Sequence, residues 1–449
     1  MPHLRGTQED VQTYRLGRRH LLNRPLTLAY CSDMANSVLD VNQSHVQHVF
    51  DFTNEVVEKY PNRLAGTEAC QNAAHRIKEE FVKNCDADSV RIEDFTVHPK
   101  SFLKYIPGLV GLYIICSILL YLQFPYLALI GYSLGIFVFY CQFVRYWETF
   151  DLLFPKATGY NVFGCIEPEG EVRQQIIVSG HHDAAYVFQL IAHAPKYYSR
   201  FITAGIGFLL LGFLVSLIEI ALIIFRGSVP GWAHPWLPLV LLVGTVFVLP
   251  LAFFTTREVS PAAGDNMTAV AISNETAKLF HDAKQTGMNP LRHTRLMVAS
   301  FDAEEAGLRG ARAFCRKHGS ELLHKKTYVL NIDTLYKVND LNFLHRDLNN
   351  SVKLSHEMAQ ECVDIAKSLG YVARISSMPF GAGSTDAAEF GKIGVEATNI
   401  AAISFDISKF GEGLVYHTPN DLTKYIEPEV VEAALKIARD YIVKKDGES

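Results

Sequence analysis

Residues 175–183, QIIVSGHHD, have the pattern of a buried strand that is followed by polar residues. Gln175–Ser179 has the length and β-branched content of a buried strand, and His181, His182 and Asp183 follow it closely. The same arrangement recurs in residues 295–305, RLMVASFDAEE, and 327–333, TYVLNID. Because open α/β sheets bind ligands at the carboxyl ends of their strands, we expect these side chains to meet.

Helix-like and strand-like segments alternate around these three strands. Apolar spacing predicts helices over residues 46–58, 71–82, 269–283 and 310–317, and strands over 90–97, 160–165, 175–179, 294–301 and 327–332. Strands that alternate with helices indicate an α/β fold with a mostly parallel central sheet flanked by helices. No internal repeat is evident.

Four long apolar runs interrupt this pattern. They are Tyr105–Gln123, Tyr126–Val144, Phe201–Phe225 and Trp236–Phe254. Each has about the 20 residues that a membrane-spanning helix needs, and Tyr and Trp at their ends are typical of the membrane interface. The mean hydropathy of +0.10 agrees. We therefore expect an integral multi-pass membrane protein with four spans, arranged as two hairpins.

The hairpins divide the predicted catalytic domain. The expected parts are an N-terminal segment (1–31), a first catalytic part (32–104), hairpin 1 (105–144), a second catalytic part (145–200), hairpin 2 (201–254) and a third catalytic part (255–449). Because each hairpin returns the chain to its starting side, all catalytic parts can share one side of the membrane.

The charges beside the spans predict the orientation. The catalytic side carries Lys100, Lys104, Arg145, Lys156, Lys196, Arg200 and Arg257, and the opposite side carries Arg226. Arg18 and Arg19 precede an apolar run, Pro25–Tyr30, that is too short for an export signal. The positive-inside rule therefore predicts a cytoplasmic catalytic domain.

Composition excludes several classes. With 49% apolar and 20% charged residues the chain is not disordered. A net charge of -5 provides no basic surface for nucleic acid. The eight cysteines form no CxxC pair, so we predict reduced, buried thiols. The lipid bilayer is an expected partner, and the oligomeric state is not predicted.

Five segments carry candidate metal ligands. They contain His181-His182-Asp183, Asp265-Asn266, Glu304-Glu305, Asp333 and His417. Taken singly, each also fits a surface turn, a helix cap or a helix start. Together, carboxylates and imidazoles near successive strand ends fit a two-metal hydrolytic site. By spacing alone, either His181 or His182 could be the ligand.

The set resembles the cocatalytic zinc metallopeptidases of the aminopeptidase and glutamate carboxypeptidase type (peptidase clan MH). The matching segments are residues 62–67 (NRLAGT), 159–162 (GYNV), 177–183 (IVSGHHD), 263–268 (AGDNMT), 301–310 (FDAEEAGLRG), 330–333 (LNID), 383–386 (GSTD) and 416–421 (YHTPND). They occur in the family order and span nearly all of the polar sequence. The residue at 269, usually Gly in this pattern, is Ala269.

The resemblance implies a role for each residue. The ligands of two Zn²⁺, with Co²⁺ or Mn²⁺ as possible replacements, would be His181, Asp265, Glu305, Asp333 and His417. Asp265 would bridge the ions, His181 and Asp333 would share one of them, and Glu305 and His417 the other. Glu304 would be the general base that activates water. Asp183 would orient His181.

Two further side chains have open interpretations. Tyr416 is either a hydrogen-bond donor to the oxyanion or a packed aromatic. Glu219 lies inside the third span, where acidic residues are rare, and it is either functional or extends to the membrane interface.

Hairpin 2 lies between His181 and Asp265, two ligands that must meet, so its ends must lie near the mouth of the site. The sequence thus predicts a dizinc hydrolase that cleaves an amide or peptide bond of a hydrophobic or acylated substrate near the bilayer. The hydrolase could be an aminopeptidase or an N-acyl amino acid amidohydrolase. Two further alternatives are a glutaminyl cyclase-like acyl transferase and an inactive receptor. A transporter is disfavoured because the spans include no broken-helix pair.

Overall fold

The computed structural model describes residues 39–287, 289–405 and 414–449. The predicted N-terminal segment (1–31) lies outside the described residues, as do residues 32–38 of the predicted first catalytic part.

A nine-stranded sheet forms the centre of the described α/β domain. Its order is β1 (Arg91–Val97), β2 (Ala157–Ile166), β6 (Thr294–Phe301), β3 (Gln174–His181), β7 (Lys326–Leu335), β11 (Glu396–Ala402), β8 (Leu341–Asp347) and β10 (Ala373–Ser377), with β9 (Val352–Lys353) paired to β8. The predicted α/β class is confirmed, and the strands that precede the candidate site, β3, β6 and β7, are central neighbours.

The sheet is mixed rather than mostly parallel. β6, β3, β7 and β11 run parallel, whereas β2 is antiparallel to β6, and β8 is antiparallel to β11. The connections explain the difference. Residues 167–173 join β2 to β3, and residues 336–340 join β7 to β8. Both are shorter than the crossover of about a dozen residues that parallel strands need.

Helices cover both faces of the sheet. On one face α3 (Gln43–Lys59), α4 (Glu68–Asn84), α10 (Thr268–Gln285), α12 (His356–Ser368) and α14 (Pro428–Gly447) form the larger apolar core. On the other, α11 (Arg309–His324) and α13 (Ala387–Lys392) form a second core. Side chains of Asn42 and Thr67 cap α3 and α4.

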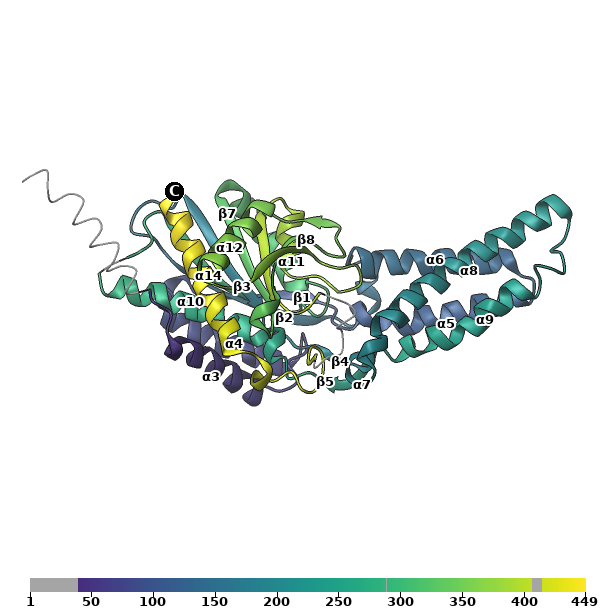
Figure 1. Cartoon of the computed structure of the whole chain (residues 1–449), viewed down its shortest axis with the longest axis horizontal. Helices are drawn as coiled ribbons and strands as arrows, with labels where there is room; N and C mark the ends of the chain where they lie inside the picture. Colours follow the sequence, from purple (N-terminus) through teal and green to yellow (C-terminus); the bar gives the residue numbers. More distant parts are fainter. Residues whose placement is uncertain (1–38, 288, 406–413) are drawn as a thin grey trace, which may run out of the picture.

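Four described helical segments are long and apolar enough to cross a membrane: Ser101–Tyr121, Pro125–Val144, Pro195–Arg226 and Trp236–Phe253. They contain α5 (Ser101–Tyr121), α6 (Pro125–Phe139), α8 (Tyr198–Arg226) and α9 (Trp236–Val248), with the short turns η2 (Tyr140–Val144) and η5 (Leu249–Phe253). Together they form an elongated bundle that extends from one end of the α/β domain (Figure 1).

The bundle is closely packed at its middle. A Cβ added to Gly212 would lie 2.2 Å from the Tyr132 ring, so only glycine leaves room for that ring. Glu219 is fully buried in the bundle, and its Oε1 lies 3.8 Å from Nδ1 of His234. This contact joins α8 to the loop that leads into α9, and both predicted interpretations of Glu219 stay predictions.

A small sheet joins the two ends of hairpin 2. β4 (Tyr186–Phe188) precedes the hairpin, β5 (Thr255–Val259) follows it, and the two strands pair antiparallel. The N–H of Phe188 donates to the carbonyl of His417 at 3.0 Å, and the two rings lie 4.1 Å apart between centroids. The base of the hairpin is therefore in direct contact with a candidate metal ligand, as the chain order requires.

Candidate metal centre

The five predicted ligands come from five places at one edge of the sheet. His181 ends β3, Asp333 lies in β7, and Glu305 follows β6. Asp265 lies in the irregular turn η6 (Ala263–Met267) before α10, and His417 lies in the loop before α14. All five are buried or nearly so because the hairpin bases and the loops cover this edge.

Asp265 lies between two imidazoles. Its Oδ1 is 3.1 Å from Nε2 of His181, and its Oδ2 is 2.8 Å from Nε2 of His417. Nε2 of His417 also lies 3.0 Å from Oε1 of Glu305. His181, Asp265 and Glu305 have ligand atoms within 4.8 Å of one another. One carboxylate in contact with two histidines is the arrangement expected of a residue that bridges two metal ions.

Asp183 holds the acidic pair that follows β6. Its Oδ1 accepts a hydrogen bond from the N–H of Glu304 at 3.0 Å, and its Oδ2 accepts one from the N–H of Glu305 at 3.1 Å. Its Oδ1 also lies 3.3 Å from Nδ1 of His181. Asp183 therefore contacts His181, as the resemblance implies, and in addition fixes the backbone of both glutamates.

Asp333 and Glu304 face Asp265 across a shared cavity, which all three carboxylates line. Glu304 Oε2 lies 3.8 Å from Nε2 of His181. The hydroxyl of Thr334 donates to Asp333 at 2.7 Å. The structure thus brings together all five predicted ligands and the predicted base, while their roles remain predictions.

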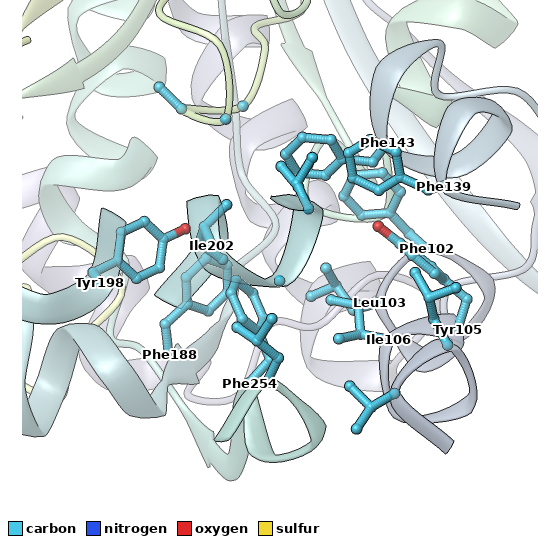
Figure 2. A pocket seen from close by; sticks show the side chains of 18 of the residues that line it. Phe102, Leu103, Tyr105, Ile106, Phe139, Phe143, Phe188, Tyr198, Ile202 and Phe254 are labelled. Atoms are coloured by element: carbon cyan, nitrogen blue, oxygen red, sulfur yellow. The ribbon is translucent and has the colours of Figure 1, made fainter. Parts of the chain in front are cut away.

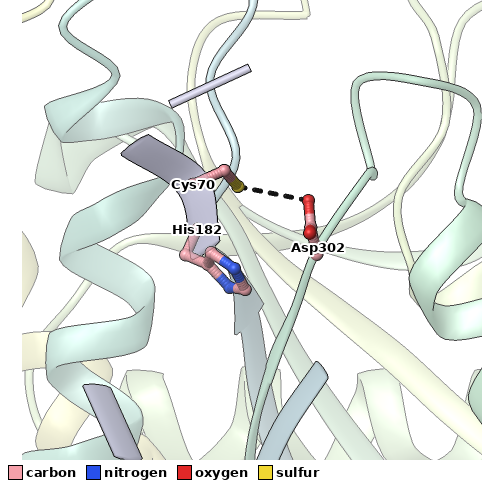
Figure 3. A group of neighbouring side chains, drawn as sticks. All are labelled: Cys70, His182 and Asp302. Carbon is pink, nitrogen blue, oxygen red and sulfur yellow. Dashed lines mark hydrogen bonds between the residues drawn. The ribbon is translucent and has the colours of Figure 1, made fainter. Parts of the chain in front are cut away.

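The two adjacent histidines point in different directions. Nδ1 of His182 lies 2.8 Å from the hydroxyl of Ser300, away from Asp265. His182 belongs to a second buried group with Cys70 and Asp302, in which the thiol of Cys70 donates to Asp302 at 3.3 Å (Figure 3). Burial, with Arg63 and His181, lowers the pKa of His182 to about 3 and keeps the ring neutral. Of the two, His181 is therefore the one placed with the other candidate ligands.

The centre is rich in buried carboxyl groups. Burial raises the pKa of Glu304 well above its usual value, and Asp333 and Glu305 raise it further, although His181 opposes them. Burial also raises the pKa of Asp333 to about 8. Burial lowers the pKa of His181, but the carboxylates of Glu304, Asp183 and Asp265 outweigh it and hold that pKa well above the usual range.

Such a cluster fits bound cations. Nδ1 of His417 is buried and has no hydrogen-bond partner among the described residues. Carboxylate oxygens and imidazole nitrogens are donors that Zn²⁺ prefers, and buried charges are stabilised when they coordinate metals. The residues present therefore fit a zinc site.

Residues without a predicted role hold the ligand loops. Asp421 accepts hydrogen bonds from the N–H groups of Gly264 at 2.8 Å and Asp265 at 3.2 Å. The buried guanidinium of Arg63 donates to carbonyls of His182, Pro261 and Ala262, and so joins the His181 segment to the Asp265 segment. Both residues lie inside motifs noted in the sequence, but a motif does not reveal which backbone groups its side chains contact.

Tyr416 stacks on His417, with ring centroids 3.9 Å apart and an interplanar angle of 18°. It lines two cavities that meet at Glu304. This position is compatible with both predicted interpretations, a packed aromatic and a donor to the substrate.

Comparisons with known proteins relate the chain to one peptidase family and to several solved structures. The profile of peptidase family M28 matches residues 247–442, a little under half of the chain. That range contains Asp265, Glu304, Glu305, Asp333 and His417 but not His181. A sequence search of curated proteins found no match.

Several solved structures are similar over most of the chain. The aminopeptidase LapA of Legionella pneumophila superposes with a TM-score of 0.51 at 12% identity, covering 92% of this chain and 75% of that one. A Zn-dependent exopeptidase from Parabacteroides distasonis gives 0.51 at 13% identity, with 88% and 97% covered. The glutaminyl cyclase of Porphyromonas gingivalis gives 0.53 at 11% identity, with 89% and 98% covered. At these identities the likeness establishes the fold alone.

Proposed function

We propose that this chain is a membrane-embedded dizinc hydrolase of the M28 type, which cleaves an amide or peptide bond with Glu304 as general base. One observation carries the proposal. Asp265 touches His181 and His417 through different oxygens, at 3.1 and 2.8 Å, and Glu304 and Glu305 stand beside these contacts on one backbone segment.

Each residue has a part in the proposed reaction. Asp265 would lie between the two ions, with His181 and Asp333 on one side and Glu305 and His417 on the other. Zinc bound there would supply polarisation of the scissile carbonyl and a lower pKa for the attacking water. Glu304 would take a proton from that water and return it to the leaving amine nitrogen.

The environment of Glu304 supports this role. Burial raises its pKa, so the carboxyl group can hold the proton between the two transfers. Its backbone is fixed by Asp183 at 3.0 Å, which limits its movement. A base that exchanges protons twice in one reaction needs this combination of position and pKa.

We infer that the four apolar helices span a bilayer and that the α/β domain is cytoplasmic. The charge asymmetry beside the spans supports this orientation. Cysteines introduced at Gly231, in the distal loop, and at Lys353, in β9, provide a test in intact cells. An impermeant thiol reagent should label Gly231→Cys and leave Lys353→Cys unlabelled until the cells are opened, and the reverse pattern would contradict the orientation. The described native cysteines are buried and leave a low background.

The reaction itself can be assigned with purified protein in lipid nanodiscs. The substrates would be aminoacyl amides, N-acyl amino acids and peptides with an N-terminal glutamine. Zinc-dependent release of an amine, lost with a chelator and regained with zinc, would support the hydrolase, and the best substrate would separate aminopeptidase from amidohydrolase. Release of ammonia with formation of a cyclic N-terminus would instead identify the cyclase. Absence of zinc and of all three activities would favour a receptor.

A further inference from the structure

A large cavity connects the candidate metal centre to the inside of the helix bundle. Its empty space, including the part that is open to solvent, is about 1310 Å³, and Glu304, Glu305 and His417 are among the residues that line it. The remaining wall comes mainly from α5, the end of α6 with η2, α8, and α9 with η5. All four apolar segments therefore contribute to a single space that opens on the proposed reaction centre.

The wall near the metal centre is aromatic. Figure 2 shows Phe188, Tyr198 and Phe254 on one side of the cavity and Phe102, Phe139 and Phe143 on the other. Phe188 and Phe254 touch each other, with ring centroids 4.6 Å apart, and Phe188 also touches His417. A substrate group that extends away from His417 on this side would enter an apolar passage.

The end of the cavity inside the bundle is also apolar. It is formed by Val110 and Tyr113 of α5, Leu209 of α8 and Val248 of α9, each at most 5% exposed. The hydroxyl of Tyr113 donates to the carbonyl of Leu241 at 2.7 Å, so its ring faces the cavity without an unpaired polar atom. From Phe102 to Tyr113 the helix rises by about 16 Å. The space is therefore much deeper than the side chain of one amino acid.

The cavity is distinct from the lipid-facing surface of the bundle. Leu209 points inward, whereas the adjacent Leu210 is 46% exposed, and Val246 on α9 is 69% exposed. The outward residues suffice to contact lipid, so membrane anchoring does not require a hollow interior. The cavity inside the bundle therefore needs another explanation. Because it is connected to Glu304, we interpret it as a binding site for part of the substrate.

A second cavity at the centre has a more mixed lining. Asp333, Thr334, Thr385 and Asn399 line it together with apolar residues such as Met378 and Ile403, and it meets the apolar cavity at Glu304. The candidate base therefore stands between a mainly apolar cavity and one that also carries several polar side chains. A molecule with its scissile bond at Glu304 would place a hydrocarbon chain in the apolar cavity and a second group in the mixed one.

We propose that the substrate carries a linear hydrocarbon chain, of the fatty acyl type, which is withdrawn from the bilayer into the interior of the four-helix bundle while its amide group lies at Glu304. This inference rests on the proposed hydrolase function and specifies its substrate. The bundle then acts as the chain-binding part of the site, and its depth sets the preferred chain length.

Two glycines of α8 provide a matched test. Gly205 lines the cavity, and a Cβ built there would lie 2.4 Å from Cδ1 of Leu251, which also lines it. Gly207 has nothing within 4 Å of its Cβ position and faces outward. Gly205→Leu therefore fills the middle of the cavity, whereas Gly207→Leu makes the same change on the outer surface.

The measurement is kcat/KM in nanodiscs for acetyl, octanoyl, dodecanoyl and hexadecanoyl amides. Two substrate series are compared, one with the hydrocarbon chain on the acyl side of the amide and one with it on the amine side. The faster series shows which side of the scissile bond carries the hydrocarbon chain. In wild type, kcat/KM should rise by up to about fourfold per buried methylene group. Gly205→Leu should lose at least about tenfold on the longer chains and little on the acetyl substrate, and Gly207→Leu should behave as wild type. Leu209→Ala should shift the optimum to longer chains. Equal rates for all chain lengths, or equal effects of the two glycine variants, would overturn the proposal.

A binding experiment separates this inference from the proposed function. Glu304→Gln protein in nanodiscs would be irradiated with a fatty acyl amide that carries a diazirine at its chain end. Labelling of Val110, Tyr113 or Leu209 is expected. This labelling can occur even if the protein hydrolyses none of the amides. Labelling confined to outward residues such as Leu210 and Val246 would contradict the inference even if hydrolysis is observed.

Discussion

Asp183 accepts a hydrogen bond from the backbone N–H of Glu304 at 3.0 Å. Its other oxygen accepts one from the N–H of Glu305 at 3.1 Å. A carboxylate that follows β3 thus holds the segment that follows β6, and that segment carries both the candidate base and a candidate ligand. Asp183 is fully buried, so water cannot replace these bonds.

We predict that Asp183→Asn lowers both zinc affinity and activity by about 10- to 100-fold, the range found when partners of metal ligands are changed. The asparagine amide would present a donor to one of the two N–H groups, so one of the two glutamates would shift. Zinc affinity by chelator competition, measured together with kcat, tests this. Asp282→Asn, at a side chain 54% exposed, is the control. Unchanged affinity and activity in Asp183→Asn would show that the contacts are not required.

Asp421 provides a similar test for the Asp265 loop. Its two oxygens accept from the N–H groups of Gly264 and Asp265, so Asp421→Asn should leave one of them without an acceptor. We expect zinc affinity to fall by about 10-fold or more, again as for partners of metal ligands. Isothermal titration of the zinc-free protein measures the change. An affinity equal to that of wild type would show that the loop holds Asp265 in place by itself.

Arg63 is expected to matter for stability. Its buried guanidinium donates to carbonyls from two segments, and burial lowers its pKa only to about 10, so it stays charged at neutral pH. Arg63→Met should reduce the free energy of unfolding by at least about 2 kcal/mol, because buried carbonyls lose their donors. Arg63→Lys should recover little, since lysine keeps the charge but not the fork of donors. Unfolding in denaturant measures both variants, and full recovery by lysine would show that charge alone matters.

Glu275 in α10 predicts a pH dependence of stability. Burial raises its folded pKa from 4.5 to about 7, and its Oε1 has no hydrogen-bond partner among the described residues. Between pH 4.5 and about pH 7, Glu275 holds a proton in the folded state but not in the unfolded state. The free energy of unfolding therefore falls as the pH rises through this interval. Glu275→Gln should therefore raise the unfolding free energy above pH 7, by at most about 3 kcal/mol, and leave it unchanged near pH 4. A stabilisation that is equal at both pH values would contradict this origin.

Much of the fold was predictable from local patterns. Strands β3, β6 and β7 are continuous apolar runs that end in polar residues, and the four apolar segments have the length of a bilayer span. The mixed sheet was not predicted, because strand direction depends on connection lengths. The short strands β9 and β10 have no clear alternation that would reveal them.

The candidate site was also largely predictable, but its supporting contacts and the apolar cavity were not. His181 and His182 are equivalent by spacing, and only the path of the chain after β3 places His181 beside Asp265 and His182 beside Ser300. The apolar spans carry little polar–apolar contrast around their axes, so their sequences do not indicate which faces surround a cavity.

The central claim is that Glu304 acts on the substrate while the neighbouring Glu305 holds metal. The most direct test measures zinc content and amide hydrolysis together in wild type, Glu304→Gln and Glu305→Gln. We predict about two zinc ions per chain in wild type and in Glu304→Gln, with hydrolysis reduced by at least about 100-fold in Glu304→Gln, and a loss of zinc in Glu305→Gln. Full hydrolysis by Glu304→Gln, or wild-type protein that binds no zinc, would contradict the account.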